Sequence, residues 1–411
     1  MANDRSFQPP AAPALPLEVF GNIIGHLNSC PDALRACSLV CRGWTTYSQS
    51  HIFQTFAFLC TPAPNPQITK AVAFFTEATH LAAYVHNITL LLDQPTNDDL
   101  PALLKLFPWV KSMHVAGIVI WHLLPASLQV SISSTVKLPT LTSLTLTKVS
   151  FHTSQDFESL LGDGAETLRS LDLVGVMLHA NPARPYALPR LSRLRLHEHR
   201  DSYMASQVSL PSIFSAPALQ ILERSFHLHP RSTADVNLPP HAHCITILKL
   251  IICLNSWYYA NDGWPITDVS TCTSLRDLHL RVTDDDQRYS THGLKWIAEF
   301  LGKLPCPGSL ESVHLVIPTD RGIPMDLWDK RGWTHLKDVL AAHAAHGTLR
   351  LVTIALERIR GSVELETAAL LRSKFSAETI IARQVRQEMQ QLSASLTLRV
   401  RFVDAPIAGV F

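Results

Sequence analysis

The sequence predicts an α/β fold, in which short parallel strands alternate with helices or loops along a curved solenoid, behind a small helical module. One pattern recurs from Val85 to Ile354: an apolar residue, two variable positions, a second apolar residue, one variable position and a third apolar residue. Several stretches between these triplets have the apolar spacing of helices. The chain has 411 residues, 46% of them hydrophobic, which is ample for a large core.

The chain begins with residues 1–14, which are rich in proline and alanine and are predicted to form a disordered leader. A first helix then follows from Pro16, which suits a first helical turn, and the Glu18 carboxylate faces the positive end of the helix dipole. Its apolar side chains fall on one arc of the helix. They are Leu17, Val19, Phe20, Ile23, Ile24 and Leu27.

A second helix is predicted from Asp32 to about Trp44, after a turn at 28–31. Its apolar residues occupy roughly 220° of the helix circumference, which is too wide for one contact. A segment of about 40 residues seldom buries enough surface to be stable alone. The surplus apolar surface therefore predicts a protein partner that covers it.

This segment resembles the F-box, a three-helix module that docks on the Skp-type adaptor of cullin ubiquitin ligases. The resemblance rests on the Leu15-Pro16 opening with Glu18, the Ile23-Ile24 pair, Leu27, Leu34, the run 38–42, Trp44 and Ile52-Phe53. Phe53 departs from the family, in which many members carry Trp. A generic helical hairpin that only caps the following domain is the alternative.

The resemblance implies an F-box module over 15–56, with a Skp-type adaptor and, through it, a cullin as partners. It also implies the residues that would bind the adaptor. They are Leu15, Pro16, Leu17, Glu18, Ile23, Ile24, Leu27, Leu39, Val40, Cys41 and Trp44.

A proline-rich run predicts a linker over 57–67, and a helix is expected from Ile68 to Tyr84. The triplets then follow, and successive ones start 23 to 39 residues apart. This spacing overlaps and then exceeds the roughly 20 to 29 residues of leucine-rich repeats. The triplets start at Val85, Val110, Leu141, Leu168, Leu191, Leu219, Ile245, Leu275, Leu310 and Leu349, of which the one at Leu219 fits only in part.

Within each triplet, the last two apolar residues are expected to share one face of a strand, and the first turns inward just before it. One strand and one helix cannot bury their own apolar faces, so neighbouring units must stack with a parallel sheet on the concave face. The segment 68–362 thus resembles a degenerate leucine-rich repeat domain. The Asn or Cys usual after such a triplet occurs only as Cys253, so irregular curvature is expected. The clearest connecting helices are predicted at 99–107, 154–161, 292–301 and 333–346.

The last segment, 363–411, is predicted to cap the solenoid. Residues 363–392 lack Pro and Gly and suggest one or two amphipathic helices, and Ser395 to Val403 suggests a final strand. A coiled-coil dimerisation element is the less favoured alternative, since no heptad is sustained.

Composition bears on partners and location. With 35 basic and 34 acidic residues and no long basic run, the chain offers no nucleic-acid footprint. No secretory signal and no apolar run of membrane-spanning length are evident, so no membrane partner is expected. The eight cysteines form no CxxC pair, which favours a reducing compartment. We therefore expect a cytoplasmic or nuclear protein.

The chain contains 20 histidines, which raise the possibility of a metal site. Several HxH pairs occur, as at 197–199 and 227–229, but none has a third ligand at a tell-tale spacing, and HExxH is absent. The GxSxG, GxxxxGK[ST] and GxGxxG motifs are absent too. The sequence thus predicts no enzyme site, no metal and no cofactor.

The concave sheet face is the better candidate for function, because solenoids present such faces to protein ligands. Its predicted substrate-binding residues are Arg193, Arg195, His197, Asp277, His279, Arg281 and His314. The leading hypothesis is a substrate-receptor subunit of a ubiquitin ligase with an unknown protein substrate. A leucine-rich repeat scaffold without a ubiquitin role is the alternative, and a metal hydrolase is a weaker third one.

Overall fold

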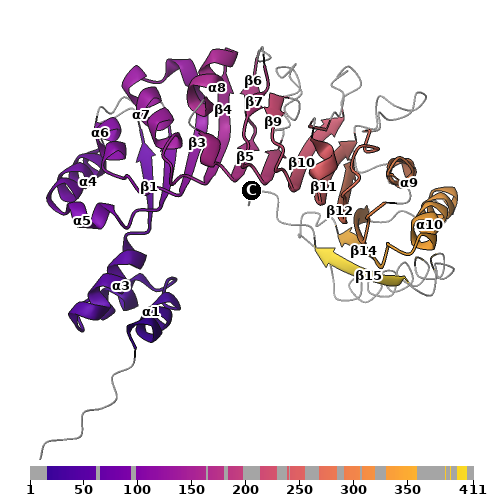
Figure 1. Ribbon diagram of the computed structural model, residues 1–411, viewed down its shortest axis with the longest axis horizontal. Coiled ribbons are helices and arrows are strands. Elements are labelled where there is room, and N and C mark those ends of the chain that lie inside the picture. Colours follow the sequence, from indigo (N-terminus) through magenta and orange to yellow (C-terminus); the bar gives the residue numbers. More distant parts are fainter. Residues whose placement is uncertain are drawn as a thin grey trace, which may run out of the picture.

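The computed structural model describes residues 16–61, 65–93, 99–162, 165–179, 184–197, 213–228, 238–239, 241–254, 268–284, 291–305, 308–319, 330–358, 385, 389 and 396–404. Within these residues, thirteen strands form one sheet that lines the inner side of an arch, and helices lie on its outer side (Figure 1). Three short helices project from the first end of the arch (Figure 1).

These three helices are α1 (Leu17–Gly25), α2 (Pro31–Ser38) and α3 (Arg42–Ile52). The prediction that the second helix continues to Trp44 is wrong, because α2 ends at Ser38 and Trp44 lies on α3. The Ser38 hydroxyl donates to the Arg35 carbonyl at 2.6 Å, and the Thr45 hydroxyl donates to the Ser38 carbonyl at 2.7 Å. These two hydroxyl groups satisfy the Arg35 and Ser38 carbonyls at the end of α2, so the helix can end at Ser38.

All twelve strands along the main path of the sheet pair in parallel with their neighbours, in sequence order. The prediction of a parallel sheet is confirmed. The strands are β1 (Thr55–Cys60), β2 (Asn87–Leu92), β3 (Ser112–Ile120), β4 (Ser143–Phe151), β5 (Ser170–Val174), β8 (Arg193–His197), β10 (Ile221–Leu228), β11 (Ile247–Leu254), β12 (Asp277–Asp284), β13 (Ser312–Thr319), β14 (Leu351–Arg358) and β15 (Thr397–Asp404). In addition, β6 (Met177–Leu178) pairs with β4, and β7 (Tyr186–Ala187) pairs with β9 (Phe214–Ser215) in a separate small sheet.

The first strand lies where a linker was predicted. β1 occupies Thr55–Cys60, across the expected boundary at 56/57, so the sheet begins before the proline-rich run. Phe58 and Cys60 are buried, whereas Ala57 and Leu59 are exposed. This alternation is the signature of a half-buried strand. The linker prediction is therefore wrong for its first residues.

Four of the outer helices match predicted ones, and the helix expected from Ile68 to Tyr84 is divided in two at Ala78. One helix, rich in β-branched residues and serine, was not predicted. The outer helices are α4 (Pro66–Glu77), α5 (Thr79–Ala82), α6 (Asp99–Lys105), α7 (Ala126–Val136), α8 (Ser154–Leu161), α9 (Thr291–Gly302) and α10 (Lys330–Ala345), of which α7 is the unpredicted one. Short 3₁₀ turns lie at Trp121–Leu123, Ala165–Thr167 and Ala242–Cys244.

Burial confirms the interpretation of the triplets. Leu141, Leu144 and Leu146 are fully buried, and the positions between them on β4 are half-buried. The partial triplet differs, because the buried Arg224 takes the place of its third apolar residue on β10. Alternate side chains of each strand therefore point toward the core, and those between them point toward the concave face.

One glycine is required by a close approach of two strands. Gly117 lies where the pairing of β3 with β4 shifts register, and it has a φ of 141°. A Cβ atom there would lie 2.0 Å from the Leu92 carbonyl oxygen. Only glycine fits this backbone conformation and this space.

An aromatic cluster joins the helical module to the first repeat. The Phe53 ring, at the end of α3, lies 6.2 Å from Phe56 on β1 and 5.9 Å from Phe74 on α4. The buried Phe75 ring lies 5.0 Å from Phe107 and 5.2 Å from Phe56. The module is thus anchored through its last helix.

At the other end, the predicted final strand is confirmed by β15. The predicted cap helices over 363–392 lie outside the described residues, except that Val385 and Met389 are helical and buried. The leader 1–14 also lies outside the described residues.

Candidate functional site

Two surfaces contain the predicted site residues, and the first is the apolar face of α1–α3. Leu39 and Val40, between α2 and α3, are 86% and 62% exposed, and Ile23 on α1 is 46% exposed. Val19 is also exposed. The expected apolar surplus is therefore present on the structure.

Not every predicted adaptor-binding residue lies on that surface. Ile24 is fully buried inside the module, so it supports the helices and cannot contact a partner directly. Trp44 and Leu27 are half-buried, and the Trp44 ring packs 5.4 Å from that of Phe20. Three further members of the set, Pro16, Glu18 and Cys41, are exposed. Leu15 and the side chain of Leu17 lie outside the part of the chain that the structure describes.

The second surface is the concave face of the sheet. Strand register places Asp172, Arg195, Glu223 and Lys249 in one row, on β5, β8, β10 and β11. The same row continues through the predicted residues His279 and His314 on β12 and β13. The remaining predicted residues, Arg193, His197, Asp277 and Arg281, lie in the two flanking rows.

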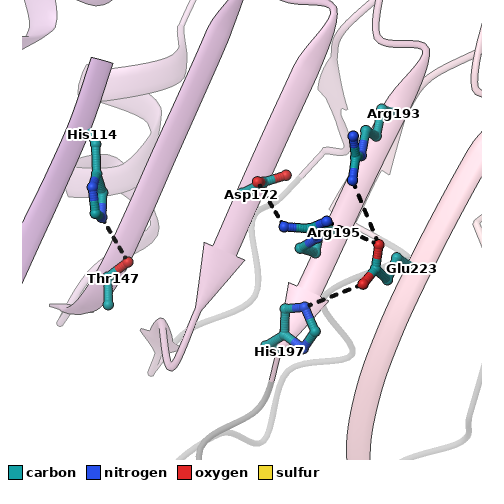
Figure 2. A network of polar contacts seen from close by, with 7 residues as sticks. All are labelled: His114, Thr147, Asp172, Arg193, Arg195, His197 and Glu223. Carbon is teal, nitrogen blue, oxygen red and sulfur yellow. Dashed lines mark hydrogen bonds and ion pairs between the residues drawn. The ribbon is translucent and has the colours of Figure 1, made fainter. Parts of the chain in front are cut away.

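Glu223 is the centre of a charge network on this face (Figure 2). Its carboxylate lies 3.2 Å from the Arg195 guanidinium and 3.7 Å from that of Arg193. Arg195 also pairs with Asp172 at 3.5 Å, and His197 lies 3.8 Å from Glu223. Two carboxylates thus neutralise two guanidinium groups across three adjacent strands.

Burial shapes the protonation of this network. Burial raises the pKa of Asp172, which Arg195 and Arg193 only partly offset. Burial also lowers the pKa of His197, against the opposing influence of Glu223. His197 is therefore a neutral imidazole at pH 7, and its contact with Glu223 is not an ion pair there.

A second group forms around β12 and β13. The His279 and His314 rings stack at 4.4 Å, and the Ser312 hydroxyl donates to the Asp277 carboxylate. Burial, together with the neighbouring His314 and Lys249, lowers the pKa of His279 to about 4. Burial also lowers the pKa of His314. This pair of imidazoles is neutral at pH 7.

The structure thus places all seven predicted substrate-binding residues on one face but divides them into two groups, since β10 and β11 lie between β8 and β12. Sequence reasoning missed Glu223, although it occupies the same place between Leu222 and Arg224 as Arg195 does between two leucines. Arg224 stands where the other repeats have an apolar residue, so the triplet at Leu219 matched only in part and Glu223 was not among the predicted concave residues.

Replacing Glu223 with Gln is expected to lower the free energy of unfolding by about 2 kcal/mol, because Arg193 loses its carboxylate partner and Arg195 keeps only Asp172. Urea unfolding followed by circular dichroism measures the change. The matched control is Glu311→Gln, which removes an exposed pair with Arg276 at 3.9 Å and should cost less than about 0.5 kcal/mol. Equal effects of the two substitutions would contradict a structural role for Glu223.

In the part of the chain that the structure describes, no group of three His, Cys, Asp or Glu side chains is placed to hold a metal ion. Likewise, none of the helices among the described residues has the length and apolar character to cross a bilayer.

No protein-family model matches the sequence, and no curated protein matches it either. Among solved structures, the chain is similar to one in the crystal structure of a TLR13–ssRNA13 complex, with a TM-score of 0.35 and 13% identity. The match covers 66% of this chain and 32% of the other, so the chain spans about a third of that chain's length. The strands, their register and their buried triplets themselves define the class, which is an α/β solenoid with a large parallel sheet, an architecture consistent with that of leucine-rich repeat proteins.

Proposed function

We propose that the chain is the substrate-receptor subunit of a Skp–cullin–F-box type ubiquitin ligase. In this role, α1–α3 dock on a Skp-type adaptor, and the concave face holds a protein substrate. The observation that carries the proposal is the exposure of Leu39, Val40 and Ile23 on a module whose sequence resembles the F-box. Exposed apolar side chains that gather on one small module of this kind are typical of a protein interface.

In mechanism, such a receptor works by proximity and catalyses nothing itself. It holds a substrate lysine near the ubiquitin-transferring enzyme and so raises the effective concentration of the reacting groups. The aromatic packing of Phe53 against Phe56 and Phe74 supports this role, because it fixes the module to the solenoid. The proposal includes a cytoplasmic or nuclear location and neither nucleic acid nor membrane as partner.

The second candidate is a leucine-rich repeat interaction scaffold with no ubiquitin role. It is favoured by the polar concave face, which suits a protein ligand whether or not an adaptor binds. In that case α1–α3 would only cap the first repeat. The exposed apolar side chains between α2 and α3 argue against a cap, since a cap turns its polar side outward.

Co-expression with a Skp-type adaptor distinguishes the two candidates. The expected result is a complex of one chain with one adaptor that stays together in size-exclusion chromatography with light scattering. A shortened chain is not needed, because the full chain carries both surfaces. Elution of the adaptor and the chain as separate species would overturn the ligase proposal and leave the scaffold.

A further inference from the structure

Three histidines form a row at the carboxyl ends of neighbouring strands, outside the two surfaces described above. His122 lies in the 3₁₀ turn after β3, His152 follows the last residue of β4, and His179 follows the last residue of β6. Each comes directly after a buried core residue, and all three are exposed. We call these three side chains the histidine row, and it lies beside β6, which is labelled at the top of Figure 1.

Strand pairing brings the three rings together, although they are about one repeat apart in the sequence. Phe151 on β4 pairs with Leu178 on β6, and the His179 amide donates to the Phe151 carbonyl at 3.2 Å. The His122 and His152 rings stack with their centroids 4.6 Å apart, and the His179 ring meets that of His152 edge to face at 4.9 Å. The central ring, His152, therefore contacts both of the others.

Imidazole is the commonest metal ligand in proteins, and it suits Zn²⁺, Cu²⁺ and Ni²⁺. Two imidazole nitrogens that share a tetrahedral Zn²⁺ each lie about 2.0 to 2.1 Å from it, and so about 3.4 Å from each other. Rings as close as those of the histidine row reach this separation by rotating about their side-chain bonds. Because the three side chains are exposed, they can rotate without displacing packed neighbours.

A buried hydroxyl group orients one of the three rings. Ser150 is 5% exposed, and its hydroxyl lies 3.2 Å from the Nε2 atom of His179. A hydrogen bond to one ring nitrogen of a histidine fixes the ring and leaves the other nitrogen to bind a metal. Ser150 thus gives the histidine row the kind of supporting contact that metal-binding histidines usually have.

The other stacked pair of imidazoles, His279 and His314 on the concave face, is a poorer metal site. Burial lowers the pKa of both rings, and the charge of Lys249 contributes to lowering that of His279. Surroundings that oppose a proton on these rings also oppose a metal cation. The histidine row is exposed instead, so water can occupy the remaining coordination positions of an ion.

We propose that the histidine row binds one divalent transition-metal ion of the Zn²⁺ type through His152 and either of its two neighbours, with water completing the coordination shell. Two protein ligands agree with the finding that, among the described residues, no group of three side chains is placed to hold a metal. No local motif predicts this site, because its ligands come from different repeats. The inference goes beyond the proposed function and depends on neither the adaptor nor the substrate.

Isothermal titration of ZnCl₂ into the full chain at pH 7.5, without a histidine tag, tests the site. Replacing His152 with Ala should weaken Zn²⁺ binding at least about tenfold, because a single imidazole loses the advantage of two linked ligands. His122→Ala or His179→Ala alone should weaken it only about twofold, since one pair remains, and the double variant should match His152→Ala. Cysteine thiols are the same in every variant and cancel in the comparison. Parent-like binding by His152→Ala or by the double variant would overturn the proposal.

The matched control is His80→Ala with His346→Ala, which removes two exposed histidines that lie outside the row. It should change Zn²⁺ affinity less than about twofold, because separate imidazoles do not act together on one ion. An equal loss in this control would mean general binding by surface histidines and would overturn the site. At pH 5.5 the parent chain should lose the ion, because protonated imidazoles cannot bind it. A difference between the parent and His152→Ala that persisted unchanged at pH 5.5 would contradict imidazole ligands.

Discussion

Replacing Val40 with Asp is expected to weaken the complex with a Skp-type adaptor at least about 100-fold, or about 2.8 kcal/mol. Val40 is 62% exposed on the free module and sits beside Leu39, the most exposed residue of the apolar face. In the complex, both side chains would be covered, and a carboxylate there would be buried without a partner. Isothermal titration of adaptor into the full chain measures the change.

The matched control is Val130→Asp on α7. Val130 is 63% exposed, so the substitution adds the same charge at the same exposure, on the outer side of the solenoid. It should leave adaptor affinity within about twofold. Circular dichroism should be unchanged in both variants, because neither residue is buried. If the Val40→Asp variant bound the adaptor as tightly as the parent chain does, the proposal that this apolar face is the docking surface would be wrong.

Much of the solenoid could be predicted from the sequence because each repeat has a local signature. The triplet at Leu141, Leu144 and Leu146 specifies which side chains turn inward, and stacking follows from the need to bury them. The start of the sheet was missed because the prolines after Thr61 set the boundary in the prediction. The alternation of Phe56, Phe58 and Cys60 was the signal that could have found β1.

The candidate site was less predictable because its contacts cross between strands. Arg195 and Glu223 are separated by a variable connection, so their pairing depends on a register that no local pattern specifies. The apolar surplus of the helical module was predictable from periodicity, but Ile24 shows the limit of that argument. A wide apolar arc indicates that some residues are exposed without indicating which ones.

Replacing Phe75 with Ala is expected to lower the free energy of unfolding by about 4 kcal/mol. Its side chain is 1% exposed and contacts four other phenylalanine rings, at centroid distances from 5.0 Å to 6.4 Å. The truncation leaves a cavity where the helical module meets the first repeat. Urea unfolding followed by circular dichroism measures the loss of stability.

The neighbouring Phe74 provides the control, because it lies on the same helix and is 43% exposed. Phe74→Ala should cost only about 1 kcal/mol. Since the Phe75 ring also supports Phe53, Phe75→Ala should speed proteolysis between α3 and β1 while adaptor affinity stays unchanged. If Phe75→Ala left both stability and proteolysis as in the parent chain, the aromatic cluster would not be what holds the docking module to the solenoid, and the fixed geometry that a substrate receptor requires would have to come from elsewhere.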